Sequence, residues 1–140
     1  MNFRTEFDQL IRAGVRGFWI TTHEEERVLP EIQATIKRGT LFSWSSSSGT
    51  ISLADNSLIV PPDDGLGGTL SKMMYEQPEG EWWLILCDPH EHIGVATKRM
   101  LREMLMQKPM NRGRFIVISP KMDIPLELNK VIMPVHFALP

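Results

Sequence analysis

The chain has 140 residues, enough for a single domain with a hydrophobic core of its own. Fifteen Lys and Arg residues against 17 Asp and Glu residues give a net charge of −2, so no general attraction to nucleic acid is expected. The lone cysteine excludes an internal disulfide framework, and the sequence contains neither a signal peptide nor an apolar run of membrane-spanning length. We therefore expect a cytoplasmic protein without membrane contacts or direct nucleic-acid binding, in which Cys87 is an inert buried thiol.

The first half of the chain predicts helices that alternate with short buried strands. Thr22, with Glu25 three residues later, matches a capping box for the second helix, and Pro30 should kink or restart that helix. In chain order we expect a helix over 3–13, a strand over 17–22, a helix that ends at Gly39, a strand over 40–44, a serine-rich turn over 45–48, a hairpin that pairs Ile51 and Leu53 with Leu58 and Val60, and irregular structure over 61–68.

The second half continues the alternation. We expect a helix over Leu70, Met73 and Met74, a strand over 81–88, a helix over 96–105 that is interrupted at Lys108-Pro109 and closed by Gly113, a strand over 114–119, a short helix over 125–131 and a last strand over 133–139. Strands that alternate with helices indicate crossover connections, and hence an α/β fold: a three-layer α/β/α arrangement around a mainly parallel sheet of about five strands. Because the chain stops on apolar residues, we expect a domain taken from a longer protein.

The apolar run over 81–88 closes on Asp88, the position where parallel nucleotide-binding sheets place a metal-directing acid. No Gly-x-x-x-x-Gly-Lys-Ser/Thr loop occurs anywhere in the chain to hold phosphates. The scaffold therefore has the pattern of a nucleotide hydrolase without its phosphate cradle. In that setting we expect Asp88 to cap the next helix or to bond within its own loop.

Other polar clusters leave alternatives open. Asp88, His90 and His92 are suitable metal ligands, although their spacing matches no structural zinc pattern and we assign no metal. The His23-Glu24 pair begins a His-Glu-x-x-His motif, but residue 27 is arginine, which excludes that protease site. The glycine-rich stretch 65–69 fails both nucleotide fingerprints and is interpreted as a flexible connector.

Two adjacent tryptophans offer a further candidate. Neighbouring residues on a strand point to opposite faces, so Trp82 and Trp83 should occupy different environments. Core packing is the simple expectation for both. One of them, like His90 and His92, is also a candidate contact for a partner.

The ordered strings at 10–13, 20–29, 42–45, 84–90, 115–120 and 124–128 resemble the N-terminal domain of an uncharacterised AAA-type ATPase family of cyanobacteria and plastids, found also in phages and bacteria. The resemblance covers nearly the whole chain except about 50–68, where the hairpin looks like an insertion. It implies a single degenerate AAA-like domain over 1–140 with P-loop-NTPase-like topology but no Walker A loop, followed in the full-length protein by a catalytic AAA ATPase domain.

The resemblance also places the site residues. Asp88 takes the Walker-B-like position, and the degenerate phosphate-loop position is occupied by Thr21, Thr22, His23, Glu24, Glu25 and Glu26. Three consecutive carboxylates at a helix start would repel a triphosphate, so no catalytic residue is assigned and no cofactor is expected in this domain. ATP and Mg²⁺ would bind the ATPase domain of the parent protein.

These observations favour a non-catalytic N-terminal domain that serves recruitment, regulation or assembly of a AAA ATPase. Its expected partners are its own ATPase domain and other protein subunits, with oligomers formed through the parent. The alternatives are a small metal- or ligand-dependent enzyme that uses Asp88, His90 and His92, and a stand-alone adaptor protein.

Overall fold

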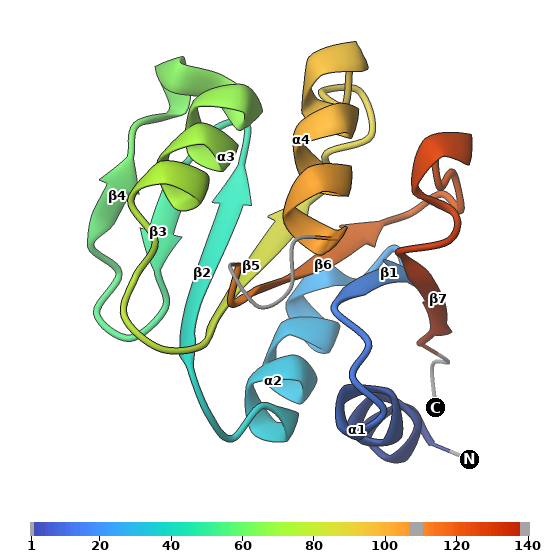
Figure 1. Cartoon of the computed structure of the whole chain (residues 1–140). Helices are drawn as coiled ribbons and strands as arrows, with labels where there is room; N and C mark the ends of the chain where they lie inside the picture. The colour runs from blue at the N-terminus through green and yellow to red at the C-terminus, as the bar shows by residue number, and fades with distance from the viewer. Residues whose placement is uncertain (1, 107–110, 138–140) are drawn as a thin grey trace.

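A computed structural model describes residues 2–106 and 111–137 and contains one seven-stranded sheet in the order β4-β3-β2-β5-β6-β1-β7 (Figure 1). The elements are α1 (Phe3–Arg12), β1 (Gly17–Thr21), α2 (Glu25–Thr35), β2 (Thr40–Ser45), β3 (Gly49–Ser52), β4 (Leu58–Val60), the 3₁₀ turn η1 (Pro62–Asp64), α3 (Gly65–Tyr75), β5 (Trp82–Cys87), α4 (Val95–Met106), β6 (Gly113–Ser119), the 3₁₀ turn η2 (Leu126–Leu128) and β7 (Met133–His136). The expected interruption at Lys108-Pro109 and the end of the expected last strand lie outside the described residues.

The five strands β2, β5, β6, β1 and β7 run parallel to one another, as the alternation of strands and helices predicts. The hairpin β3–β4 adds two antiparallel strands at one edge, which brings the sheet to seven strands. Figure 1 shows α1 and α2 on one face of the sheet and α3 and α4 on the other. The three-layer α/β/α fold is confirmed.

Alternate side chains of β5 enter two different hydrophobic clusters. Trp82, Leu84 and Leu86 belong to the cluster covered by α3 and α4, which we call the α3/α4 cluster. Trp83, Ile85 and Cys87 belong to the cluster covered by α1 and α2, the α1/α2 cluster. A parallel strand buried on both faces needs this continuous apolar sequence.

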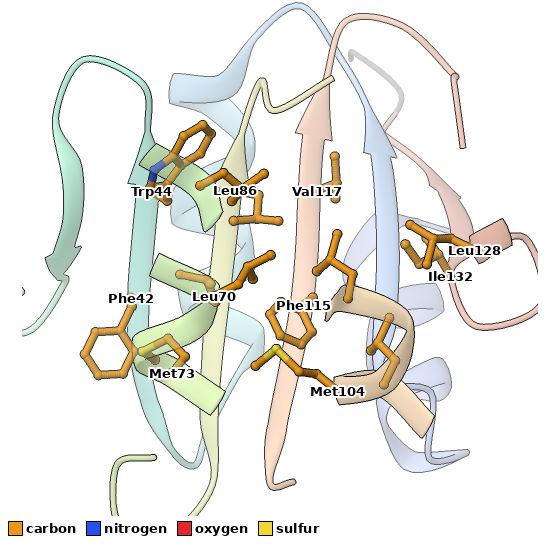
Figure 2. Packing of buried hydrophobic residues seen from close by; sticks show 14 of the residues in the cluster. Phe42, Trp44, Leu70, Met73, Leu86, Met104, Phe115, Val117, Leu128 and Ile132 are labelled. Carbon is orange, nitrogen blue, oxygen red and sulfur yellow. The ribbon is translucent and has the colours of Figure 1, made fainter. Parts of the chain in front are cut away.

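The helices complete these clusters with apolar side chains at helical spacing. Figure 2 shows Leu70 and Met73 of α3 and Met104 of α4 lying over the strand residues Phe42 and Phe115. On the other face, Phe7 of α1 packs edge-on against Phe18 with ring centroids 5.0 Å apart. Both helix layers are thus held to the sheet by burial of apolar surface.

The start of α2 differs from the predicted capping box. The helix begins at Glu25 with Glu24 as the N-cap residue, and no side chain caps it. Thr22 instead accepts a hydrogen bond from the Glu24 amide at 3.1 Å. The predicted box is wrong because Thr22 lies two residues before the N-cap position. The helix also runs through Pro30 without restarting, and it ends at Thr35, before Gly39.

The glycine-rich stretch is helix and not a flexible connector. α3 begins at Gly65, inside the segment predicted to be irregular. Leu66, Thr69, Leu70 and Met73 are its buried residues, and their spacing is that of one helix face. Burial of that face outweighs the poor helix propensity of glycine.

Two smaller expectations near the C-terminal end are also wrong. Gly113 starts β6 and does not close a helix. Glycine is required there because any Cβ would collide with the Trp82 ring on the neighbouring strand. The short helix expected over 125–131 is only the 3₁₀ turn η2, Leu126–Leu128. β7 carries Pro134, which an edge strand tolerates.

Candidate functional site at the carboxyl edge of the sheet

The carboxyl ends of β1, β5 and β6 meet at one edge of the sheet. β1 and β6 are neighbours in the sheet, but the connections that follow them run in opposite directions. The chain passes from β1 to β2, toward the β4 edge of the sheet, and from β6 to β7, which forms the opposite edge. This reversal is a topological switch point, where open α/β sheets place their ligands. This edge is therefore the candidate functional site.

Only three residues, 22–24, connect β1 to α2 at this edge. The Thr22 amide donates to the Ser119 carbonyl at 2.9 Å, which extends the pairing of β1 with β6. The Glu24 carboxylate pairs with Arg27 at 3.2 Å, whereas Glu25 and Glu26 stand in the first turn of α2. A phosphate-binding loop has eight residues and presents free amides and a lysine. The junction over 22–24 is shorter, contains no lysine and leads into consecutive glutamates.

Asp88 lies where the sequence places it, directly after β5. Its backbone adopts a left-handed conformation with φ of 54°, which aspartate tolerates better than most residues. Its amide donates to the Ile118 carbonyl at 2.7 Å, and its Oδ1 lies 2.7 Å from Nδ1 of His90. The side chain thus contacts its own loop and does not cap α4.

The His90 contact is close but poorly aligned. Although Nδ1 of His90 is only 2.7 Å from the carboxylate, no acceptor among the described residues meets it with hydrogen-bond geometry. We therefore treat it as a short polar contact and not as an oriented hydrogen bond.

His92 does not join Asp88 and His90. Its exposed ring meets Trp44 edge-on, with ring centroids 5.5 Å apart. Within residues 2–106 and 111–137, no three His, Cys, Asp or Glu side chains are grouped as metal ligands would be. The three residues of the metal-dependent alternative border one pocket but are not grouped as a ligand set.

Two pockets lie at this edge of the sheet. One, of about 200 Å³, is bordered by Thr22, His23, Glu25, Asp88 and Ser119, among others. The second, of about 520 Å³, lies between the serine turn 45–48 and the loop that contains Asp88, and its lining is mainly polar. Both pockets are bordered by carboxylates and by histidines but by no Lys or Arg side chain, so neither offers a permanent positive charge.

Cys87 borders the larger of these two pockets without being reactive. Burial, followed by the nearby negative charge and hydrogen bond of Glu25, raises the pKa of the Cys87 thiol to about 12. The thiolate is the nucleophilic form, so the thiol is inert near neutral pH, as the sequence predicts.

The two tryptophans occupy different environments, on opposite faces of the sheet. Trp82 is fully buried and Trp83 is 3% exposed. The Trp82 indole donates to the Gln77 side chain at 3.2 Å, and Arg114 stacks over the Trp83 ring at 5.1 Å. Neither indole is on the surface, so the interpretation of one as a partner contact finds no exposed ring to support it.

A pocket of about 650 Å³ that the sequence analysis missed lies between α4 and the segment around η2. We call it the α4/η2 groove, and its lining residues are Val95, Lys98, Arg99, Arg102, Met106, Leu126, Glu127, Asn129, Lys130 and Val131. The α4 members follow the helical repeat on the side opposite Leu101, Met104 and Leu105. The spacing of these residues could have identified this face of α4 from the sequence. It could not have shown that η2 lies beside that face.

Comparisons with known proteins point to one family. The family described as SpoVK-like AAA ATPase, N-terminal domain, matches residues 3–137. The uncharacterized AAA domain-containing protein ycf46 of Guillardia theta is 27% identical over 145 residues, an alignment that covers 100% of this chain and 28% of that relative. The chain thus spans less than a third of the curated relative's length. No solved structure matches it. In the described residues no helix is long and apolar enough to cross a bilayer.

Proposed function

The chain belongs to the SpoVK-like AAA ATPase N-terminal domain family, and from that premise we propose that it is a non-catalytic domain that recruits partners to an ATPase, regulates it or supports its assembly. The observation that carries the proposal is the junction between β1 and α2. The sheet is of the type found in nucleotide hydrolases, in which this junction binds the phosphates through free amides and a lysine. Here the junction has only three residues and leads into consecutive glutamates.

The proposal extends to the protein that contains this domain. A catalytic AAA module with ATP and Mg²⁺ follows Pro140, and this domain contacts that module and other protein subunits in the cytoplasm. The support is the family description as an N-terminal domain and the much greater length of the plastid relative. The reading frame downstream of Pro140 tests this part: a Gly-x-x-x-x-Gly-Lys-Ser/Thr motif is expected there.

Nucleotide titration tests the non-catalytic role. We expect no saturable heat when Mg-ATP or Mg-ADP is titrated into the domain, because Glu24, Glu25 and Glu26 repel the phosphates. A chain of the same family that carries a complete phosphate loop is the positive control. Density for ADP against Thr22 and His23 in a crystal soaked with that nucleotide would overturn the proposal.

The metal-dependent alternative is less well supported, because Asp88, His90 and His92 border one pocket but the described residues hold no group of three side chains placed as metal ligands. Metal analysis of the purified chain separates the two hypotheses. Stoichiometric zinc or manganese that is lost in Asp88→Ala would support the enzyme. The stand-alone adaptor differs from the main proposal only in lacking a downstream ATPase module.

A further inference from the structure

The α4/η2 groove combines exposed apolar side chains with basic ones. Val95 is 85% exposed, Leu126 is 78% exposed and Met106 is 57% exposed. These are three of the seven large hydrophobic side chains that are exposed in the described part of the chain, and all three border this groove. Such a concentration of exposed apolar surface in one concave site is typical of an interaction surface.

The charge in the groove is positive, although the whole chain has a net charge of −2. Lys98, Arg99, Arg102 and Lys130 line it, and Glu127 is the one acidic lining residue. Two of the cations are neutralised, because Lys98 pairs with Glu127 at 3.2 Å and Arg99 pairs with Glu103 at 3.1 Å. Within the described residues, the side chains of Arg102 and Lys130 have no ionic or hydrogen-bond partner.

The groove is formed before any partner binds. Leu128 and Ile132 anchor the segment around η2 in the α3/α4 cluster, and the Lys98–Glu127 pair ties η2 to α4. Because the walls are fixed, a partner would lose little binding energy to ordering them. The 12 residues of α4 extend for about 18 Å, which matches roughly three turns of a second helix.

We infer that the α4/η2 groove binds an acidic amphipathic helix of a partner protein, whose apolar face contacts Val95, Met106 and Leu126 and whose carboxylates pair with Arg102 and Lys130. The inference rests on the proposed role as a partner-binding domain and names the surface and the partner's chemistry. Charge complementarity selects the occupant. The exposed apolar side chains fit the apolar face of an amphipathic helix, and the unpaired cations require carboxylates on its flanks. A nucleic acid would leave the apolar side chains without a contact.

A synthetic peptide tests the inference directly. The probe is a fluorescein-labelled peptide of 14 residues with leucines at helical spacing on one face and glutamates beside them, titrated with the whole domain and followed by fluorescence anisotropy. We expect saturable binding with a dissociation constant on the order of 10 μM, weakened several-fold when NaCl rises from about 50 to 500 mM. A peptide of the same composition in scrambled order, and one with lysine in place of glutamate, should bind at least tenfold more weakly.

Matched variants locate the site. Arg102→Glu with Lys130→Glu, and separately Leu126→Ser, should each weaken peptide binding about tenfold or more. Arg38→Glu and Leu58→Ser change an exposed arginine and an exposed leucine elsewhere and should leave it unchanged. Thermal unfolding of every variant verifies that it is folded. If the double charge reversal does not fold, Leu126→Ser, at an exposed position, still tests the inference.

Four results would overturn the inference, and three of them concern how binding is distributed. They are equal binding of the acidic and lysine peptides, loss of binding in the control variants alone, and tighter binding of a 20-nucleotide single-stranded DNA than of the acidic peptide. Absence of any peptide binding would also overturn it. None of these results alters the nucleotide titration above, so failure of the groove inference is distinguishable from failure of the proposed function.

Discussion

Arg16 is a buried cation held by backbone carbonyls and not by a carboxylate. It is 8% exposed, and its guanidinium donates to the carbonyls of Leu105 at 2.9 Å, Asn111 at 2.8 Å and Gly113 at 2.7 Å. Burial, and to a smaller extent the charge of Arg114, lowers the pKa of Arg16. The side chain therefore joins the start of β1 to the end of α4 and the start of β6.

Arg16→Met should lower the free energy of unfolding by about 3 kcal/mol, because three buried carbonyls lose their donor while the volume is kept. Urea unfolding followed by tryptophan fluorescence measures the change. Arg38→Met, at an exposed position, is the control and should stay within about 0.5 kcal/mol of the wild type. Equal stability of the two variants would contradict the anchoring role.

Burial of the Cys87 thiol should make the free energy of unfolding depend on pH in the alkaline range. Burial raises the pKa of its thiol from 9.0 to about 12, so the folded chain holds this proton more tightly than the unfolded chain does. The unfolded chain loses the proton first as pH rises, and the free energy of unfolding should fall between pH 9 and 12. Below pH 9 the contribution is fully present.

Urea unfolding of the wild type and of Cys87→Ala at several pH values measures this contribution. All other titratable groups are the same in the two proteins, so their effects cancel in the comparison. The wild-type curve should fall more steeply with pH than the Cys87→Ala curve. Parallel curves would show that Cys87 does not titrate as its burial requires.

At the scale of the elements, strands were easier to predict than helix ends. The apolar run ending at Asp88 identifies β5 without ambiguity, because burial on both faces requires every residue to be apolar. The start of α3 was missed, because Gly65, Gly67 and Gly68 argue locally against a helix and only the buried face of Leu66 and Leu70 supports one. Local propensity was outweighed there by packing that the sequence does not display.

A pair of glycine substitutions tests the helical state of this stretch. A Cβ on Gly67 would meet only a Thr97 methyl carbon at 3.9 Å, whereas a Cβ on Gly68 would approach Asp64 Cβ to 2.7 Å. Gly67→Ala should therefore raise the free energy of unfolding by about 0.5 kcal/mol, and Gly68→Ala should lower it. Thermal unfolding compares the two, and equal small effects would indicate that the segment is a flexible connector after all.

For the whole molecule, the candidate site could be predicted in position but not in detail. Asp88 was located correctly because the end of a buried parallel strand defines a place at the sheet edge. The contact of His92 with Trp44 could not be predicted, because Trp44 lies on a strand more than 40 residues earlier. The α4/η2 groove was missed for the same reason, since its two walls are distant in sequence.

The sheet joins the two hydrophobic clusters into a single folding unit. β5, β6 and β1 contribute side chains to both clusters, so neither helix layer has a core that is independent of the other. Phe7 and Leu70 are fully buried on opposite sides of this sheet. We therefore expect loss of either cluster to unfold the entire domain in one transition.

Phe7→Ala and Leu70→Ala should each lower the free energy of unfolding by roughly 3 kcal/mol. Because the sheet separates the two sites and they share no direct contact, the double variant should be additive within about 0.5 kcal/mol. Urea unfolding should show the same midpoint by far-ultraviolet circular dichroism and by tryptophan fluorescence in the wild type and in each single variant. Separate midpoints in Phe7→Ala, with the α3/α4 cluster unfolding later than the α1/α2 cluster, would show that the layers fold independently.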